Sequence, residues 1–307
     1  MTEMSHNEIM YRPGTMADSY ATFLLFEESF ADLVRRFGQT ETTSWPNADD
    51  LARMWVERQS LYDYLARSAE HFWVAEQNGQ LIGFARSVFH DGVRELTEFF
   101  MKPTAQSAGV GRELLQRAFP AEGARHRLVI ATLDMRAQAR YLKTGVYPYH
   151  PLYYFGREPR PVTVATDLQI VPLAAAPDIF DTLAAIDRAV IGFRRDADHQ
   201  WLMGDRAGFM LLRQGQPVGY GYTGVRNGPF ALLDAQDYPA VLAYAESLAA
   251  ANQHPHFGVE LPMLNHIAVN YLLEQGFRMD AFTAVFIWDK PLGNPANYIC
   301  TSPPFFL

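Results

Sequence analysis

The order of hydrophobic and polar residues divides the first half of the chain into a short strand, two helices and a run of further strands. Helical spacing of apolar residues marks the helices, and short segments rich in β-branched and aromatic residues mark the strands. The predicted strands are residues 8–12, 71–76, 80–89, 95–101 and 127–132, and the predicted helices are residues 16–38, 49–67, 110–119 and 134–145. The dipeptide Asn78-Gly79 lies between two of these strands and is a strong hairpin signal. The pattern therefore predicts an α+β domain with a mostly antiparallel sheet.

Residues 100–111 join a predicted strand to a predicted helix and contain Gln106, Gly109 and Gly111. Glycine lets the backbone approach a ligand closely, and a helix N-terminus offers unpaired N–H groups and a partial positive charge. This combination predicts an anion site, with phosphate as the favoured ligand. A P-loop does not fit, because Gly111 is followed by Arg112 instead of lysine, and the dinucleotide pattern of three glycines is missing. An ordinary glycine-containing connection is the alternative.

The second half of the chain repeats the pattern of the first at a spacing of about 130 residues. Hairpin glycines recur as Gly79 and Gly83 in the first copy and as Gly215 and Gly219 in the second. One set of helix positions, at offsets of three, seven and eleven, also recurs as Asp134, Ala137, Tyr141 and Gly145, then as Asn265, Ala268, Leu272 and Gly276. The repeat predicts two like domains, residues 1–160 and 167–307, joined by a proline-containing linker within residues 157–166.

The spacing Gln106-x-x-Gly109-x-Gly111, after a strand that ends in x-x-Pro, resembles the pyrophosphate loop of the GNAT N-acetyltransferases, which holds coenzyme A. The last core helix of this family often carries Asn, Ala, Tyr and Gly at the offsets seen here for Asp134, Ala137, Tyr141 and Gly145. The resemblance implies two tandem GNAT-like α+β domains, each with a mixed, mostly antiparallel sheet flanked by helices. It also implies acetyl-CoA as the co-substrate, bound by the first domain.

The resemblance assigns roles to individual residues of the first domain. The backbone at the strand end would contact the pantetheine arm and the thioester, and the loop would bind the diphosphate. The implied strand-end residues are Phe99, Phe100 and Met101, and the implied loop residues are Gln106, Ser107, Ala108, Gly109, Val110, Gly111 and Arg112. Tyr141 is implied as the general acid, because a phenol with a pKa of about 10 stays protonated at neutral pH and can protonate the departing thiolate.

Two acidic residues of the strand at 95–101 are candidates for the general base. Side chains alternate along a strand, so Glu95 and Glu98 are expected on opposite faces, with only one of them facing the cleft. Some members of the family carry a catalytic glutamate at the position of Glu95, whereas others have an acid at the position of Thr97. A bound water that relays the proton from a more distant group is a further option.

The second copy lacks the features that the resemblance links to coenzyme A. Its counterpart of the loop has no glycine and carries Asp234 and Asp237, which would repel a diphosphate. Leu272 stands where the first copy has Tyr141. We therefore expect the second domain neither to bind coenzyme A nor to transfer an acyl group. Completing the acceptor pocket and forming a homodimer are the roles that stay open for it.

The composition of the chain mainly excludes classes of partner. The chain has 307 residues, 49% of them hydrophobic, and a formal net charge of −8. Residues 1–160 carry 18 Lys and Arg against 20 Asp and Glu, a balance of −2, and residues 161–307 carry 8 against 14, a balance of −6. A nucleic-acid partner is disfavoured, because nucleic acid is bound by basic patches. A small cationic acceptor is compatible with this balance.

No apolar run reaches the roughly 18 residues of a membrane span, and the N-terminus lacks a signal-peptide pattern. We therefore expect a cytoplasmic protein without a membrane partner. The single cysteine, Cys300, excludes an intramolecular disulfide. No histidine stands in a metal-ligand spacing with an acid partner, so no metal is predicted.

Taken with the resemblance, these features predict an N-acetyltransferase. It would transfer acetyl from acetyl-CoA to a primary amine of a small acceptor by direct attack in a ternary complex. The competing interpretation is a non-catalytic protein whose first domain senses acyl-CoA and whose second domain engages a partner. A longer acyl group or an alcohol acceptor would use the same motifs, and the sequence does not identify the acceptor.

Overall fold

The computed structural model describes residues 8–38, 46–105, 109–173, 178–302 and 304. The chain forms two compact units that divide between Arg127 and Leu128, inside strand β5 (His126–Thr132). This division lies upstream of the predicted linker. The division follows how tightly the residues pack, whereas the predicted domains 1–160 and 167–307 follow the sequence repeat. The predicted domains stay a prediction. The two units are described separately below.

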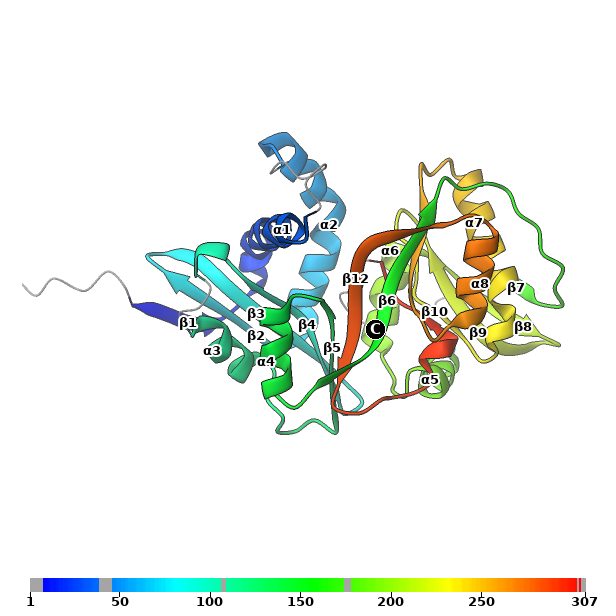
Figure 1. The fold of residues 1–307 in the computed structure, drawn as a ribbon. Coiled ribbons are helices and arrows are strands. Elements are labelled where there is room, and N and C mark those ends of the chain that lie inside the picture. Colours follow the sequence, from blue (N-terminus) through cyan, green and yellow to red (C-terminus); the bar gives the residue numbers. More distant parts are fainter. Residues whose placement is uncertain (1–7, 39–45, 106–108, 174–177, 303, 305–307) are drawn as a thin grey trace, which may run out of the picture. The chain divides into compact units, whose positions relative to one another are not determined.

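The first unit is an antiparallel sheet with three helices (Figure 1). Its strands are neighbours in the order β1-β2-β3-β4, and each pair is antiparallel. Its elements are β1 (Ile9–Pro13), α1 (Ser19–Arg36), α2 (Ala48–Ser68), β2 (Ala69–Gln77), β3 (Gln80–His90), β4 (Val93–Met101) and α3 (Val110–Ala118), with short 3-10 turns at η1 (Met16–Asp18) and η2 (Pro103–Ala105). The hydrophobic pattern predicted each of these strands and helices to within a few residues.

The predicted hairpin between β2 and β3 is confirmed, and its backbone explains the choice of residues. Asn78 has a φ of 53° and Gly79 a φ of 72°. Two successive residues with positive φ twist the turn in the same sense as the strands, and asparagine and glycine adopt this conformation at low cost. The turn therefore fixes the register of β2 against β3.

Helices cover both faces of this sheet. Phe84 of β3 packs in a hydrophobic cluster with Leu25 of α1. Its neighbour Gly83 faces α3, because a Cβ built on Gly83 would lie 3.0 Å from the side chain of Leu114. Successive residues of a strand point to opposite faces, so α1 and α3 lie on opposite sides of the sheet.

The second unit combines four strands of one sheet with a separate five-stranded sheet. The four strands are neighbours in the order β5-β12-β6-β11, and the five follow the order β13-β10-β9-β8-β7. Every pairing within these two sets is antiparallel. Besides β5, the elements are α4 (Met135–Lys143), β6 (Tyr147–Arg157), β7 (Gln169–Pro172), α5 (Ile179–Val190), α6 (Asp196–Asp205), β8 (Ala207–Arg213), β9 (Gln216–Thr223), β10 (Phe230–Leu232), η3 (Ala235–Asp237), α7 (Tyr238–Ala251), β11 (Phe257–Pro262), α8 (His266–Glu274), β12 (Arg278–Trp288), η4 (Pro295–Asn297) and β13 (Tyr298–Ile299).

The two longest strands of this unit, β6 and β12, occupy equivalent places in the two sequence copies. Each spans 11 residues, and each follows a helix, α4 or α8. They pair with each other, and each also pairs with a strand of the other copy. Leu152–Arg157 of β6 pairs with β11, whereas Ala284–Trp288 of β12 pairs with β5. The copies therefore exchange strands, an arrangement that a sequence repeat does not reveal.

The predicted linker is fastened to helix α7. The side chains of residues 158–166 are exposed or half-buried, as expected, but the backbone is fixed. Arg157 forms an ion pair with Glu246 at 2.6 Å. The backbone N–H of Val162 donates to Ser247 Oγ at 2.9 Å, and this hydroxyl donates to the Val162 carbonyl at 2.8 Å. The segment is a docked connection and does not act as a flexible spacer.

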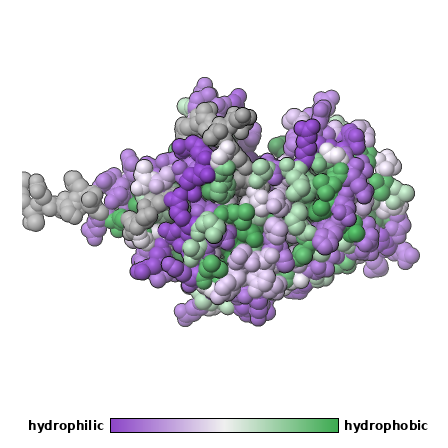
Figure 2. Space-filling view, viewed as in Figure 1, coloured by the Kyte–Doolittle hydropathy of each residue, from purple (hydrophilic) through white to green (hydrophobic). Residues whose placement is uncertain are grey.

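The visible surface is mixed in character. On the face shown in Figure 2, polar residues cover most of the area and hydrophobic residues reach it in patches, which is ordinary for a folded chain. Among the helices of the described residues, none combines the length and apolar character needed to cross a membrane.

Strand exchange makes the first copy dependent on the second. We expect a fragment that ends at residue 160 to fold poorly, because β12 lies between β5 and β6 and supplies hydrogen bonds to both. Far-UV circular dichroism and thermal unfolding of the fragment, compared with the whole chain, measure this. A monomeric fragment with a sharp cooperative transition would contradict the expectation.

Candidate functional site

The candidate loop lies between the end of β4 and the start of α3. Gly109 is the residue before α3 and has a left-handed backbone with φ of 81°. A Cβ built on it would meet no atom within 4 Å, so the backbone here borders open space. The predicted ligands Gln106, Ser107 and Ala108 lie outside the described residues. What is described is the glycine and the helix that follows it.

Helix α3 offers its N-terminus beside Gly109. The amides of Arg112 and Glu113 turn back to the Gly109 carbonyl at 3.0 and 3.3 Å, which starts the helical ladder. The amides of Val110 and Gly111 precede that ladder and have no acceptor within the helix. Val110 and Gly111 are buried while Arg112 is exposed. These N–H groups and the helix dipole fit an anion such as a diphosphate.

The strand end that precedes the loop is half-buried and anchored on one edge. Phe99, Phe100 and Met101 pair with residues 83–85 of β3. The carbonyl of Met101 accepts a hydrogen bond from Ser29 Oγ of α1 at 3.0 Å. The position of this backbone is therefore fixed by contacts within the first unit.

The two candidate bases on β4 lie on the same face, and the expectation of opposite faces was wrong. Arg86 pairs with Glu98 and the next residue of β3, Ser87, pairs with Leu96, so Thr97 is an extra residue in a bulge. Val88 then pairs with Glu95. Directly paired residues point to the same side, and so do Arg86 and Val88, which are two apart. The bulge resets the alternation on which the expectation relied.

Glu98 is committed to a buried ion pair with Arg86. Neither side chain has any exposed area. Burial raises the pKa of the Glu98 carboxyl, and the guanidinium of Arg86 offsets part of this. The guanidinium carbon lies 4.8 Å from the ring centroid of Phe72 and 5.4 Å from those of Tyr62 and Phe84. Arg86 also donates to the Tyr62 carbonyl of α2 at 3.3 Å, so the pair helps to hold the sheet to this helix. A carboxyl enclosed in this way is poorly placed to take a proton from an acceptor. Glu95 is also buried, at 3% exposed, and Glu95 or a relayed water stays the prediction for the base.

Tyr141, the candidate acid, lies in the second unit on helix α4. Asp134 caps this helix by accepting the Arg136 N–H at 2.8 Å, and Gly145 follows it with a positive φ of 83°. Tyr141 is buried, and burial raises the pKa of its phenol above the ordinary value, with the charge of Asp134 adding to the effect. The group is therefore protonated at neutral pH, the state that a general acid needs.

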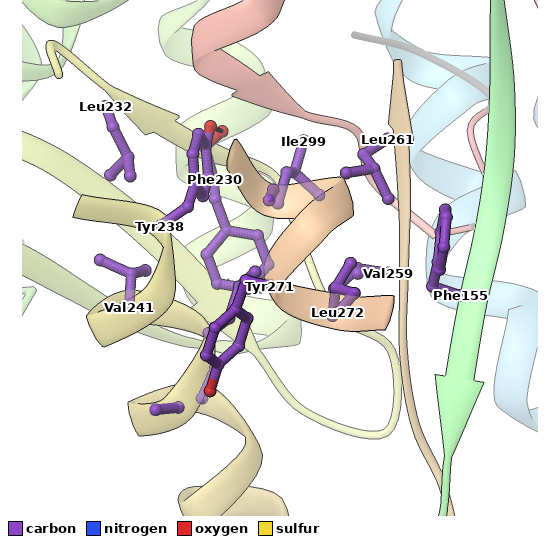
Figure 3. Close-up of a cluster of buried hydrophobic side chains, with 14 of the residues drawn as sticks. Phe155, Phe230, Leu232, Tyr238, Val241, Val259, Leu261, Tyr271, Leu272 and Ile299 are labelled. Carbon is purple, nitrogen blue, oxygen red and sulfur yellow. Dashed lines mark hydrogen bonds between the residues drawn. The ribbon is translucent and has the colours of Figure 1, made fainter. Parts of the chain in front are cut away.

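The second copy places its own side chains at the equivalent positions. The Asp234 carboxylate accepts the Gln236 N–H at 2.9 Å and so caps the turn that corresponds to the loop. Asp237 forms an ion pair with Arg213 at 2.7 Å. Leu272, the counterpart of Tyr141, is fully buried in a hydrophobic cluster of residues from β6, β10, α7 and β11 (Figure 3).

Comparison with protein families adds a match over residues 34–146, to the model described as the acetyltransferase (GNAT) family. This part of the chain matches the GNAT acetyltransferase family. The match includes the loop and the whole of helix α4 with Tyr141, and the family is one of acyltransferases. The comparison with curated proteins found no match.

Solved structures share the GNAT fold over nearly the whole chain. A "Putative Acetyltransferase" from Pyrococcus horikoshii has 13% identity and a TM-score of 0.73, and the match covers 97% of this chain and 95% of that one. A tandem GNAT protein from the clavulanic acid biosynthesis pathway has 13% identity and a TM-score of 0.58, with coverage of 92% and 99%. A GCN5-related N-acetyltransferase from Sphaerobacter thermophilus has 12% identity and a TM-score of 0.58, with coverage of 95% and 99%. The tandem arrangement predicted from the repeat is confirmed at the level of the fold.

The buried pair makes a specific stability prediction. Glu98→Ala should lower the free energy of unfolding by about 3 kcal/mol, because it leaves Arg86 charged and enclosed without its partner. The double variant Arg86→Met, Glu98→Leu should recover most of this loss. Asp32→Asn, which removes one partner of the helix-surface pair with Arg36, is the control and should cost less than about 1 kcal/mol. Urea unfolding measures all three, and equal losses for Glu98→Ala and Asp32→Asn would refute the structural role.

Proposed function

We propose that this chain is an N-acetyltransferase that transfers acetyl from acetyl-CoA to a primary amine of a small acceptor. The observation that carries the proposal is the open N-terminus of α3 next to Gly109, inside the region that matches the GNAT family. In this proposal the amides of Val110 and Gly111 bind the diphosphate. Residues 106–108 and Arg112 would complete that contact. The backbone of Phe99 to Met101 would lie along the pantetheine arm.

The proposed reaction is a direct transfer in a ternary complex. The uncharged amine attacks the thioester carbonyl, a C–N bond forms and the C–S bond breaks. The proton lost by the amine passes to Glu95 or to a water that Glu95 orders. Tyr141 gives its phenolic proton to the departing sulfur. A backbone N–H of the β4 end would stabilise the oxyanion that develops on the carbonyl oxygen.

A charge placed at Gly109 tests the coenzyme site. Gly109→Asp should weaken acetyl-CoA binding by at least about a hundredfold, because a carboxylate would face the diphosphate at a helix N-terminus. Gly109→Asn is the matched control: it has the same size, and asparagine tolerates the left-handed backbone. Titration calorimetry compares the two. If both variants weaken binding equally, charge is not the cause; if neither does, the loop is not the site.

The role of Tyr141 is tested by removing only its hydroxyl. Tyr141→Phe should lower kcat by about a hundredfold while changing the Kd of acetyl-CoA by less than about twofold, because the hydroxyl acts in the chemical step. Tyr271→Phe, a helix tyrosine of the second copy, is the control and should leave kcat unchanged. Unchanged turnover in Tyr141→Phe would remove this residue from the mechanism.

The assay that supports these kinetics also tests the function itself. Release of the coenzyme A thiol from acetyl-CoA is followed with a panel of primary amines, from diamines to amino sugars. Turnover with any of them supports the proposal and names the acceptor class. Tight binding of acetyl-CoA with no thiol release from any amine or alcohol would favour the acyl-CoA sensor, an interpretation that gains from the enclosure of Glu98.

A further inference from the structure

Residues 298–300, near the C-terminal end of the sequence, lie between two strands of the second copy. Strand β13 pairs with β10 through Phe230 with Ile299 and Ala231 with Tyr298. On its other side, Cys300 forms a bridge to Glu260 of β11, with the Cys300 N–H donating to the Glu260 carbonyl at 2.8 Å. Strands β10 and β11 belong to different sheets, and residues 298–300 are the segment that joins them.

Strands β10 and β11 have counterparts in the first copy, and these counterparts show what the position of residues 298–300 corresponds to. Strand β10 precedes the turn with Asp234, as β4 precedes the candidate coenzyme loop. Strand β11 precedes helix α8, as β5 precedes helix α4. The space between β10 and β11 is therefore the second copy's equivalent of the space beside the end of β4, where the proposed function places the pantetheine arm of the first copy. This reasoning rests on that proposed function.

The terminal strand is enclosed as tightly as any core segment. Tyr298, Ile299, Cys300 and Thr301 are each at most 1% exposed. Ile299 belongs to the main hydrophobic cluster of the second unit. A segment buried to this degree is an integral part of the fold and cannot be displaced without exposing the core.

Polar contacts fix the strand at both ends. Arg195 Nη1 donates to the Tyr298 hydroxyl at 2.9 Å, and Asn265 Nδ2 donates to the Tyr298 carbonyl at 3.4 Å. The Ser302 N–H donates to the Asn227 carbonyl at 3.0 Å. Asn265 is the cap of α8 and occupies the position of Asp134 in the repeat. In the second copy, the residue that caps the helix thus makes a second contact, which is to the terminal strand.

Gly228 shows that the backbone of the second copy is shaped around this strand. A Cβ built on Gly228 would lie 2.0 Å from the carbonyl oxygen of Cys300, and the residue has a positive φ of 83°. Both features require glycine, because a side chain would collide with the terminal strand and strain the backbone. The close approach of two backbones is therefore built into the sequence.

We infer that residues 298–301 permanently fill the space between β10 and β11, which is the second copy's equivalent of the coenzyme site. The strand supplies the backbone pairing and apolar filling for which the first copy uses a bound pantetheine arm. The chain consequently binds one acetyl-CoA and has no latent second site that could be opened by ligand. The second copy is a structural partner that stays complete without a coenzyme.

The only cysteine of the chain, Cys300, provides a direct probe of this strand. Its thiol is fully buried, so alkylation by iodoacetamide under native conditions requires the strand to open. Wild-type protein should be alkylated slowly, at the same rate with and without saturating acetyl-CoA, and calorimetry should give one acetyl-CoA per chain. A second equivalent bound, or faster alkylation with acetyl-CoA, would overturn the inference.

Two variants test what holds the strand. Tyr298→Phe removes one of the acceptors of Arg195 and should speed alkylation about tenfold, since a buried charged donor loses one of its hydrogen bonds. Asn265→Asp keeps the helix cap through its oxygen but loses the donor to the Tyr298 carbonyl, and should act in the same direction. Tyr271→Phe is the control. Fast alkylation in the wild type, or rates unchanged in both variants, would overturn the inference.

This design separates the inference from the proposed function. Failure to bind any acetyl-CoA would overturn the proposed function of the first copy. The alkylation rates of Cys300 would then still decide whether residues 298–301 are a fixed strand. Two bound equivalents would leave the proposed function standing and overturn the inference.

Discussion

The antiparallel pairing of β6 with β12 is the contact on which the second unit depends. Both edges of both strands are used, since β6 also pairs with β11 and β12 with β5. Removing either strand would leave unpaired backbone groups on two neighbours at once. The tandem copies are therefore joined by strand pairing as well as by the linker. Helix α4, which carries Tyr141, lies in the chain between β5 and β6, and both of these strands pair with β12 of the other copy.

Buried charges stabilise the interior of both copies but in different ways. In the first copy Arg86 and Glu98 are enclosed by aromatic rings. In the second copy a larger network surrounds Asp187, which accepts from Arg195 at 3.3 Å and interacts with His199 Nε2 at 2.8 Å and with the Tyr220 hydroxyl. Burial alone would raise the pKa of Asp187, but these partners lower it below its ordinary value.

The network around Asp187 also contacts the terminal strand. Arg195 donates to Tyr220 at 2.7 Å and to the hydroxyl of Tyr298, so one guanidinium links α5, β9 and β13. Burying a charge costs free energy unless hydrogen bonds replace those to water, and here three elements supply these hydrogen bonds. The interior of the second copy is thus specified by polar geometry as well as by hydrophobic packing.

Much of this structure was predictable from the sequence, and the failures have physical causes. Local signals such as Asn78-Gly79 and the apolar periodicity of α3 predicted their elements because turn chemistry and helix packing act over a few residues. The bulge at Thr97 was missed because the alternation of side chains between faces assumes a regular strand. The available signal was Arg86, which lies in an apolar, buried strand and therefore needs an acid facing it. Strand exchange and the place of β13 depend on contacts between distant segments, to which a repeat pattern is blind.

Strand exchange also constrains the order in which the chain can fold during synthesis. Thr132 of β5 pairs with Ala284 of β12, a separation of 152 residues (284 − 132). Contacts between segments so far apart form late, because a long loop must close before they contribute. The sheet that includes β5 and β6 is therefore incomplete until β12 has left the ribosome. The nascent first copy spends that time with a strand edge exposed, which is the state most open to aggregation or to chaperones.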